Sequence, residues 1–258
     1  MKKIFISLVL AMTILLLLPL GAFANSRQAH SWYCMRAGNE QPKIEPQMDF
    51  IDKYNGYFVD KSAKEEDKVI YLTFDAGYEN GNIAKILDVM KKHKVTGAFF
   101  VLENIIKRDT ELVCRMANEG HLVCNHTASH KDMTEMYDID SFRAELTRLE
   151  EVYTEYTGKE MTKLYRPPEG KFSEENLCFA KELGYSTVFW SLAYADWDNN
   201  AQPSKESAKE ILLKNTHNGM ILLLHPTSAT NAAILDELIC HWKKEGYRFG
   251  DLNELCKK

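Results

Sequence analysis

The sequence of 258 residues predicts a parallel α/β fold, with a closed or nearly closed barrel favoured over an open sheet. From residue 68 onward, apolar segments of strand length alternate with segments of helical periodicity. Chemically reactive side chains follow the ends of several of these apolar segments. A hydrophobic content of 45% allows one large core in a chain of this length. The alternation itself is compatible with either a barrel or an open sheet.

The first 24 residues do not belong to the predicted fold. Lys2 and Lys3 precede an apolar run over residues 4–20, and an Ala-Phe-Ala sequence occupies residues 22–24. This arrangement is typical of a secretory signal peptide, and an uncleaved membrane anchor is the alternative. We therefore expect the chain to be exported.

Residues 25–66 lack a regular pattern but contain many aromatic side chains. We expect an N-terminal arm that packs these rings against the main domain, which covers residues 67–258. A flexible linker is the alternative, although linkers contain few aromatic residues. The aromatic residues that support the arm are Trp32, Tyr33, Tyr54, Tyr57 and Phe58.

Seven strands and six helices are expected in the main domain. The segment 68–74 is rich in β-branched and aromatic residues, and the segment after it has apolar residues on one helical face. The expected strands are 68–74, 96–101, 121–124, 163–166, 186–192, 219–224 and 247–249. The expected helices are 82–93, 109–119, 140–157, 173–183, 204–215 and 229–245.

Charge and cysteine content exclude two classes of site. The net charge of −5 provides no basic surface for a nucleic acid. The six cysteines include no C-x-x-C pair, which argues against a zinc site made of thiolates. We expect most of them to be buried free thiols, with at most one or two disulfides.

Asp75 ends the first predicted strand and precedes a loop and a helix. Ligands and catalytic groups lie at this position in barrels and open sheets of alternating strands and helices. Capping of the following turn is the alternative role for Asp75.

His126 and His130 follow the third strand, four residues apart. We expect them on one face of a helical turn, where both could bind one metal ion, and two unrelated surface histidines are the alternative.

Two further strand ends carry polar or aromatic residues. Arg166 leads into two prolines and Gly170, a segment stiff enough to hold the guanidinium beside a carboxylate. Trp190 and the pair Asp196-Trp197 follow the fifth strand, and such aromatic and acidic residues are common in sugar-binding sites. The alternatives are a surface arginine on a stiff loop and a core position for Trp190.

His225 directly follows the sixth strand. Imidazole can exchange protons near neutral pH, so this residue is a candidate acid or base. A hydrogen-bonded core histidine is the alternative.

Together these segments resemble the polysaccharide deacetylases of the NodB-homology type, carbohydrate esterase family 4. The resemblance covers about residues 67–250, and its motifs are 73–77 (TFDAG), 126–130 (HTASH), 166–170 (RPPEG), 196–197 (DW) and 223–225 (LLH). It implies a distorted, partly open (β/α)7-type barrel. It also implies a hydrolase that removes the N-acetyl group from an amino sugar by cleaving a linear amide C–N bond.

The resemblance implies four catalytic residues. Asp75 would be the general base that deprotonates water, and Arg166 would pair with it. His225 would protonate the leaving amine, and Asp196 would orient His225.

Metal and substrate residues are also implied. His126 and His130 would bind a divalent cation, for which zinc is expected. Most of the family has an acid as third ligand at the position of Ala76, which cannot coordinate, and this departure leaves open whether the metal is required. The residues expected to contact substrate are Glu169 through its backbone N–H, Trp197, Leu223, Tyr165 and Trp190.

The continuation at 78–81 (YENG) and the aromatic arm resemble the PdaA-type subgroup, which forms muramic δ-lactam in the spore cortex. This implies N-acetylmuramic acid in stem-free peptidoglycan as substrate, in sporulation or germination. An N-acetylmuramoyl-L-alanine amidase would act first, and the protein would be a monomer in the cell wall, the cortex space or outside the cell. The alternatives are an N-acetylglucosamine deacetylase of peptidoglycan or chitin oligomers, and a glycan-binding protein with a degenerate metal site.

Overall fold

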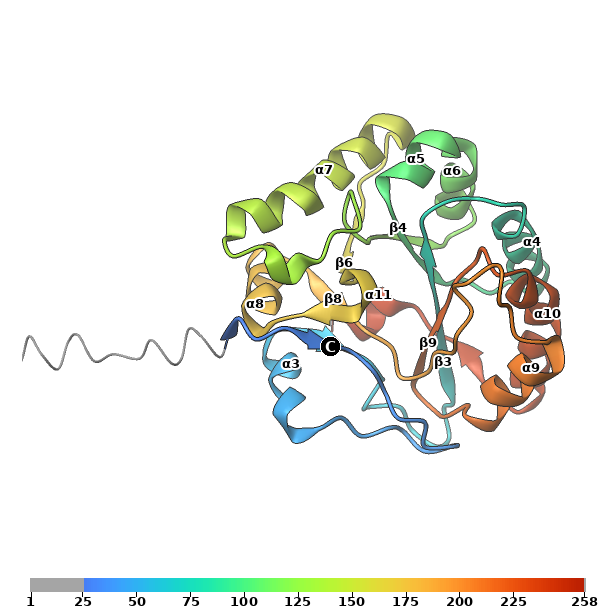
Figure 1. The fold of residues 1–258 in the computed structure, drawn as a ribbon. Helices are drawn as coiled ribbons and strands as arrows, with labels where there is room; N and C mark the ends of the chain where they lie inside the picture. Colours follow the sequence, from blue (N-terminus) through green and yellow to red (C-terminus); the bar gives the residue numbers. More distant parts are fainter. Residues whose placement is uncertain (1–25, 258) are drawn as a thin grey trace, which may run out of the picture.

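The computed structural model describes residues 26–257, and its centre is one sheet that curls on itself (Figure 1). In this part of the chain, β10, β3, β4, β5, β6, β8 and β2 lie side by side in that order, and β9 also pairs with β3. Neighbouring strands of this sheet run parallel. The expected signal peptide lies outside the described residues.

All seven expected strands are present. They are β3 Val69–Ala76, β4 Ala98–Val101, β5 Leu122–Asn125, β6 Thr162–Tyr165, β8 Ser186–Val188, β9 Met220–Leu224 and β10 Arg248–Phe249. Beyond β8, a β-bridge joins Leu192 to Leu222 of β9, and the Leu223 N–H donates to the Leu192 carbonyl at 2.9 Å. This short contact brings the two sides of the curled sheet together, which confirms a distorted, partly open barrel.

The six expected helices cover the outside of the sheet (Figure 1). They are α4 Ile83–His93, α6 Thr110–Asn118, α7 Ile139–Thr157, α8 Glu174–Glu182, α9 Lys205–Lys214 and α10 Ala229–Lys244. Four of them begin where a side-chain oxygen accepts a backbone N–H of the first turn. These capping residues are Asp138, Ser173, Ser204 and Ser228.

Several short elements were not expected, because two to six residues are too few to show a period. They are β1 His30–Ser31, η1 Pro46–Met48, α3 Phe50–Lys53, β2 Gly56–Tyr57, α5 Glu103–Arg108, η2 Met133–Glu135, η3 Pro168–Gly170, β7 Lys171–Phe172 and α11 Leu252–Leu255.

Successive side chains of β3 face two different cores. Val69 and Tyr71 belong to a buried cluster inside the curled sheet, which is completed by the leucines of α11. Ile70, Leu72 and Phe74 belong to a larger cluster between the sheet and helices such as α4 and α10. This alternation is the two-residue period of a strand buried on both faces. It gives the odd-numbered residues of β3 one direction, into the barrel.

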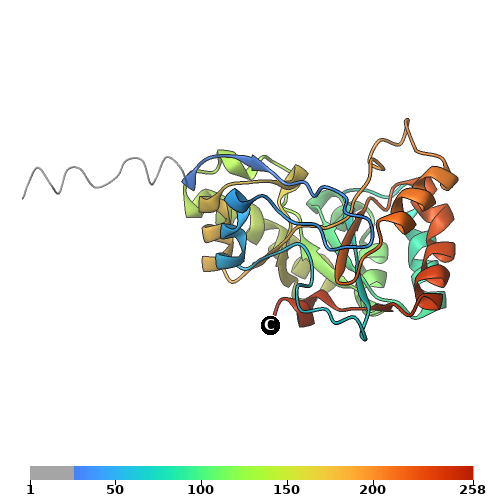
Figure 2. The ribbon, with the colours of Figure 1, turned by 90° about the horizontal axis from the view of Figure 1, so that it is seen from below.

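The two ends of the barrel differ. The amino ends of the strands are covered by α11, which lies near the centre of Figure 1 and contributes Leu252 and Leu255 to the inner cluster. Figure 2 shows the chain between β8 and α9 projecting on one side of the molecule, and the C-terminus lying on the other. The carboxyl ends of the strands are therefore the end that this long connection borders.

The N-terminal arm packs its aromatic rings as expected. Trp32 and Phe58 share a buried cluster with Phe172 and Phe189, and the Trp32 and Phe189 rings stack at a centroid distance of 4.4 Å. The arm is more regular than expected, because β2 pairs with β8 and extends the sheet. A two-residue strand has no pattern that distinguishes it from irregular chain.

The expectation that most cysteines are buried is wrong. All six are free thiols, but Cys124 is the one that is fully buried, and Cys240 is exposed.

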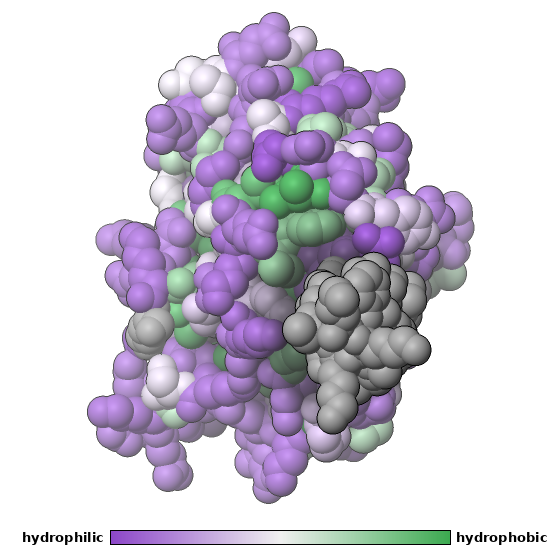
Figure 3. Space-filling view, turned by 90° about the vertical axis from the view of Figure 1, so that its left-hand side faces the viewer, coloured by the Kyte–Doolittle hydropathy of each residue, from purple (hydrophilic) through white to green (hydrophobic). Residues whose placement is uncertain are grey.

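None of the helices within residues 26–257 is both long and apolar enough to cross a bilayer. The face shown in Figure 3 is largely hydrophilic, with its main hydrophobic area near the centre and smaller ones elsewhere.

Candidate active site

Asp75 lies at the carboxyl end of β3, inside the barrel. The alternation that points Val69 and Tyr71 inward gives Thr73 and Asp75 the same direction. The Asp75 side chain is 11% exposed, so it is accessible from the open end while most of its surface is desolvated. The strand continues to Ala76, one residue beyond Asp75. The strand therefore holds the carboxylate, as predicted.

Arg166 binds Asp75 and is itself completely buried. Its Nη1 donates to Asp75 Oδ1 at 2.8 Å, and its Nη2 donates to Thr73 Oγ1 at 2.9 Å. The remaining donors reach main-chain carbonyls, with Nε 2.9 Å from Val188 O and Nη2 3.2 Å from Phe189 O. These four hydrogen bonds hold the planar guanidinium in one orientation. The guanidinium in turn fixes the position of the Asp75 carboxylate.

His126 and His130 lie together beside Asp75. Their ring centroids are 5.1 Å apart, and His126 Nε2 is 3.6 Å from Asp75 Oδ2. His126 Nδ1 is 2.8 Å from the carbonyl oxygen of Arg166. A carbonyl only accepts, so Nδ1 carries the proton and the lone pair of Nε2 faces Asp75. Side chains from three different strand ends thus meet at one place.

The chain that carries the two histidines is a loop and not the helical turn that we expected. Thr127 and His130 have left-handed φ values of 70° and 57°. The Asn125 side chain accepts the Thr127 N–H at 2.9 Å, and the Thr127 hydroxyl accepts the His130 N–H at 2.9 Å. These local bonds replace the main-chain bonds of a helix, which explains the difference. The loop nevertheless brings both imidazoles together.

Glu145 of α7 anchors this loop. Its Oε2 accepts the Ser129 N–H at 3.1 Å and the Ser129 hydroxyl at 2.8 Å. Its main-chain carbonyl accepts the Ala128 N–H at 3.2 Å, and its Oε1 is 3.1 Å from Lys131 Nζ. Glu145 therefore holds Ala128, Ser129 and Lys131, which lie on both sides of His130.

Asp196 holds His225 by two bonds. Its Oδ1 is 2.7 Å from the ring Nδ1 of His225, and its Oδ2 accepts the His225 N–H at 2.8 Å. Asn231 of α10 donates to the same Oδ2 at 2.6 Å. Asp196 is completely buried, whereas the His225 side chain is 26% exposed. Since Nδ1 donates to the carboxylate, the ring Nε2 is the atom left for a substrate.

The surroundings set three protonation states. Burial acts to raise the pKa of Asp75, but the charge and hydrogen bond of Arg166, together with the neighbouring His126 and His225, outweigh it and hold that pKa below its usual value of 3.8. Burial lowers the pKa of His126 to about 4. Burial also acts to lower the pKa of His225, yet the hydrogen bond and charge of Asp196 raise it above 6.5. Near pH 6.5 the site therefore holds an ionised acid, a neutral His126 and a protonated His225.

Aromatic and apolar side chains border the polar groups. Trp197 is 62% exposed, with its ring centroid 6.3 Å from that of His225. Leu223 of β9 pairs with Thr73 of β3, which precedes Asp75 by two residues in the same strand. Trp190 is half-buried, and its ring centroid is 5.8 Å from the guanidinium carbon of Arg166. The structure thus gathers these three predicted residues around the site.

Tyr165 does not reach the site, and the prediction that it contacts substrate is wrong. Its side chain is 1% exposed and belongs to a buried cluster with Phe142 and Leu146 of α7. Tyr165 and Arg166 are consecutive in an extended segment, so their side chains point to opposite sides of the sheet. Arg166 takes the inner side, which leaves the outer side for Tyr165.

The side chain of Glu169 points to solvent, so only its main-chain N–H is available to the site. Glu169 has a left-handed φ of 55° in the turn after the two prolines, and its exposed carboxylate binds Lys171 Nζ at 2.8 Å. The left-handed conformation is strained for residues other than glycine, and residues strained in this way are frequent at functional sites. The role of the Glu169 N–H toward an oxyanion stays a prediction.

The two imidazoles beside Asp75 are candidate ligands for a divalent cation. His126 is neutral, and its Nδ1 bond to a carbonyl oxygen is the arrangement that orients most metal-binding histidines. His130 supplies a second imidazole at the same place. Ala76 is fully buried and supplies no donor atom. Within the described residues, Asp75, His126 and His130 do not form a group whose donor atoms all lie within 4.8 Å of one another, so a third ligand beside the two imidazoles would be water or a shifted Asp75.

Three residues of the site were missed in the sequence. Thr73 donates its hydroxyl proton to the Leu222 carbonyl at 2.7 Å and accepts from Arg166. Its position two residues before Asp75 in one strand is a signal that could have identified it. Asn231 and Glu145 lie within helices, and no local pattern marks them, because their partners are 35 and 16 residues away.

The chain is similar to known deacetylases. A family model described as polysaccharide deacetylase matches residues 62–188. The chain is 42% identical over 227 residues to the peptidoglycan-N-acetylmuramic acid deacetylase PdaA of Bacillus subtilis, covering 87% of this chain and 85% of the relative. The structure of that protein, a family 4 carbohydrate esterase, matches with a TM-score of 0.84 and 40% identity, covering 89% of this chain and 97% of the other.

Two further relatives are more distant. The structure of a family 4 carbohydrate esterase from Bacillus anthracis matches with a TM-score of 0.73 and 38% identity over 90% of this chain and 98% of the other. A peptidoglycan-N-acetylglucosamine deacetylase of Bacillus cereus is 32% identical over 204 residues, or 78% of this chain and 71% of the relative. The sequence identity is thus higher to the muramic acid deacetylase than to the glucosamine deacetylase.

Proposed function

This chain belongs to the polysaccharide deacetylases of carbohydrate esterase family 4, with the NodB fold, and from that premise we propose that it removes the acetyl group of N-acetylmuramic acid in peptidoglycan. Membership of this family identifies the chain as a hydrolytic de-N-acetylase. The muramic sugar is supported by one observation, the 42% identity to a muramic acid deacetylase over most of both chains, against 32% to a glucosamine deacetylase.

Asp75 is the general base of the proposed reaction. It accepts a proton from water, and the water oxygen forms a bond to the carbonyl carbon of the acetyl group. Arg166 keeps the carboxylate ionised and aimed, since its Nη1 holds Oδ1 and leaves Oδ2 for the water. The second oxygen lies on the side of His126, 3.6 Å from Nε2.

His225 is the general acid. The C–N bond breaks as Nε2 of His225 gives its proton to the leaving nitrogen, so the products are acetate and a free amine. Asp196 supports this role in two ways, because it orients the ring and raises the pKa of His225. Two groups with pKa values pushed apart in this way divide the base and acid roles between them.

A divalent cation, for which we propose zinc, would be held by His126 and His130. When bound, it would polarise the acetyl carbonyl and lower the pKa of water. The rest of the site acts on the acetyl group by shape and hydrogen bonding. Leu223 and the exposed Trp197 ring border the acetyl methyl and the sugar, and the Glu169 N–H donates to the developing oxyanion.

We also propose a biological setting, which is supported by the resemblance of residues 78–81 and the aromatic arm to the δ-lactam-forming subgroup. A free amine next to the lactyl carboxyl of muramic acid can close to a δ-lactam, provided that no stem peptide occupies the carboxyl. An N-acetylmuramoyl-L-alanine amidase would therefore act first. We place the protein, as an exported monomer, in the cell wall or spore cortex space during sporulation or germination.

Mass spectrometry of denuded glycan tests the sugar. The strands are incubated with the protein, digested and analysed for acetate loss from each sugar, with Asp75→Asn as the inactive control. We expect N-acetylmuramic acid to lose its acetyl group, and one water as well where the lactam closes. Loss confined to glucosamine would support the second candidate, an N-acetylglucosamine deacetylase, which the 32% identity to such an enzyme favours. Binding without any acetate release would leave the glycan-binding role.

A further inference from the structure

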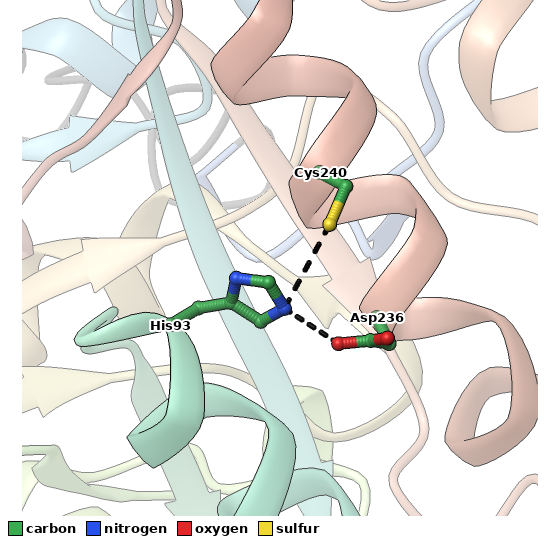
Figure 4. A group of neighbouring side chains, drawn as sticks. All are labelled: His93, Asp236 and Cys240. Atoms are coloured by element: carbon green, nitrogen blue, oxygen red, sulfur yellow. Dashed lines mark hydrogen bonds and ion pairs between the residues drawn. The ribbon is translucent and has the colours of Figure 1, made fainter.

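A second group of side chains that could bind a metal ion lies between α4 and α10 (Figure 4). His93 is the last residue of α4, and Asp236 and Cys240 are four residues apart on α10. Residues at this spacing share one face of a helix. Figure 4 shows both of them facing the imidazole of His93.

The donor atoms are close enough to share one ion. His93 Nε2 is 2.5 Å from Asp236 Oδ1 and 4.0 Å from Cys240 Sγ, and all three donor atoms lie within 4.8 Å of one another. Zinc bound tetrahedrally at about 2.0–2.3 Å separates its ligand atoms by about 3.3–3.8 Å. The two observed separations lie on either side of that range. Shifts of less than about 1 Å in side chains at a helix surface would bring all three donors to ligand distance.

We propose that His93, Asp236 and Cys240 form a second divalent-cation site, which takes a thiophilic transition-metal ion such as Zn²⁺. One nitrogen, one oxygen and one sulfur donor suit zinc or cobalt and disfavour Mg²⁺ and Ca²⁺, which require oxygen ligands. Water would fill the fourth position, because Cys240 is exposed. The site is independent of the proposed deacetylase function.

Two lysines near the cluster oppose a cation and must be considered. Lys92 Nζ lies 2.7 Å from Asp236 Oδ1, and Lys243 Nζ lies 2.6 Å from the main-chain oxygen of His93. Lys92 is more than half exposed, so its long side chain can move into water without leaving a buried charge. The carboxyl end of α4 partly compensates, since the dipole of a helix is negative there.

The expected role is to join two helices rather than to catalyse. α4 leads away from the loop after Asp75, and α10 leads away from His225 and carries Asn231, which binds Asp196. Metal bound between them would oppose their separation, because it binds the folded arrangement and not the unfolded chain. The ion would therefore raise the thermal stability while leaving the site at the barrel mouth unchanged.

Cobalt absorption tests the site, because a thiolate bound to Co²⁺ gives a charge-transfer band in the near ultraviolet. None of the residues proposed to bind metal at the barrel mouth is a cysteine, so a band that disappears in Cys240→Ser reports the second site. We titrate the reduced full-length protein with Co²⁺ and then with Zn²⁺, and we compare Cys240→Ser, His93→Gln and the matched control Cys178→Ser. Cys178 is a partly exposed cysteine on another helix, α8.

We expect a one-to-one band in the unchanged protein and in Cys178→Ser, its displacement by Zn²⁺, and its loss in Cys240→Ser. His93→Gln should weaken Co²⁺ binding by more than about tenfold, since losing a residue that merely orients a ligand already weakens it about 10–100-fold. The double variant His126→Gln/His130→Gln should keep the band. Absence of the band from the unchanged protein, or its survival in Cys240→Ser, would overturn the proposal and leave an ordinary ion pair between His93 and Asp236.

Discussion

Asp196 bonds to both the ring and the main-chain N–H of His225, at 2.7 and 2.8 Å. One buried carboxylate therefore fixes the ring relative to the end of β9 and sets its tautomer at the same time. The ring Nε2 is left at the barrel mouth, on the side of Asp75, whose negative charge also raises the pKa of His225. This pairing is the basis for assigning the acid role to His225.

Replacing Asp196 by Asn should shift the pH dependence of the reaction. The reaction needs protonated His225, so kcat/KM falls as the pH rises through the pKa of that residue. Asp196 raises this pKa, and the neutral amide removes the charge that does so. We therefore expect the basic limb of the kcat/KM profile to move to lower pH, together with a lower maximum. A profile that only decreases in height would show that Asp196 positions the ring without tuning it.

Asp75→Asn should remove the general base and leave the fold intact. Asn keeps an oxygen that can accept from Arg166 Nη1, but the buried guanidinium loses its counter-charge, so we expect a folded protein with a lower melting temperature. Loss of a general base lowers the rate by about 10²–10⁴-fold. Acetate release from stem-free glycan measures the effect, with and without a chelator. A variant that keeps more than a tenth of the activity contradicts the role of Asp75.

Arg166→Met should destabilise the protein and abolish activity. The substitution leaves Asp75 as a largely buried charge without its main partner, and removing one member of a buried ion pair costs about 3–5 kcal/mol of unfolding free energy. Urea unfolding followed by circular dichroism gives that value. Arg248→Met is the matched control, because Arg248 and Asp67 form an exposed pair whose loss should have little effect. Equal stability of the two variants would contradict the assigned role of Arg166.

Glu145→Gln should weaken metal binding without touching a ligand. The change removes the charge that holds Ser129 and Lys131, and the loop that positions His130 becomes less rigid. Partners that orient metal ligands typically contribute about 10–100-fold to affinity or activity. We expect a raised Kd for Zn²⁺ at the barrel mouth, measured by calorimetry on a Cys240→Ser background that isolates this site.

Glu151→Gln is the control for this prediction, because Glu151 lies on the same helix with its side chain exposed. Unchanged Zn²⁺ affinity in Glu145→Gln would mean that the main-chain bonds of the loop position His130 without the carboxylate. A loss of melting temperature equal in both variants would point to a general effect on α7.

The sequence predicted the site best where the chemistry lies at the end of a regular strand. Asp75 and His225 end or follow segments with a clear apolar pattern, Arg166 follows the shorter segment 162–165, and parallel strands bring their carboxyl ends to one edge. The pattern was less informative where two neighbours differ in direction. Tyr165 and Arg166 are adjacent in sequence, but only the position of the barrel interior decides which of them reaches the site.

The sequence by itself determined the alternation of strands and helices, the order of the reactive residues and their placement at strand ends, because these depend on periods of two and 3.6 residues within one segment. The tertiary structure decided which side chain faces inward, the left-handed loop that joins His126 to His130, and the partners Glu145 and Asn231. Those features arise from contacts between segments far apart in the chain. No local pattern records such contacts, because their free energy depends on both partners at once.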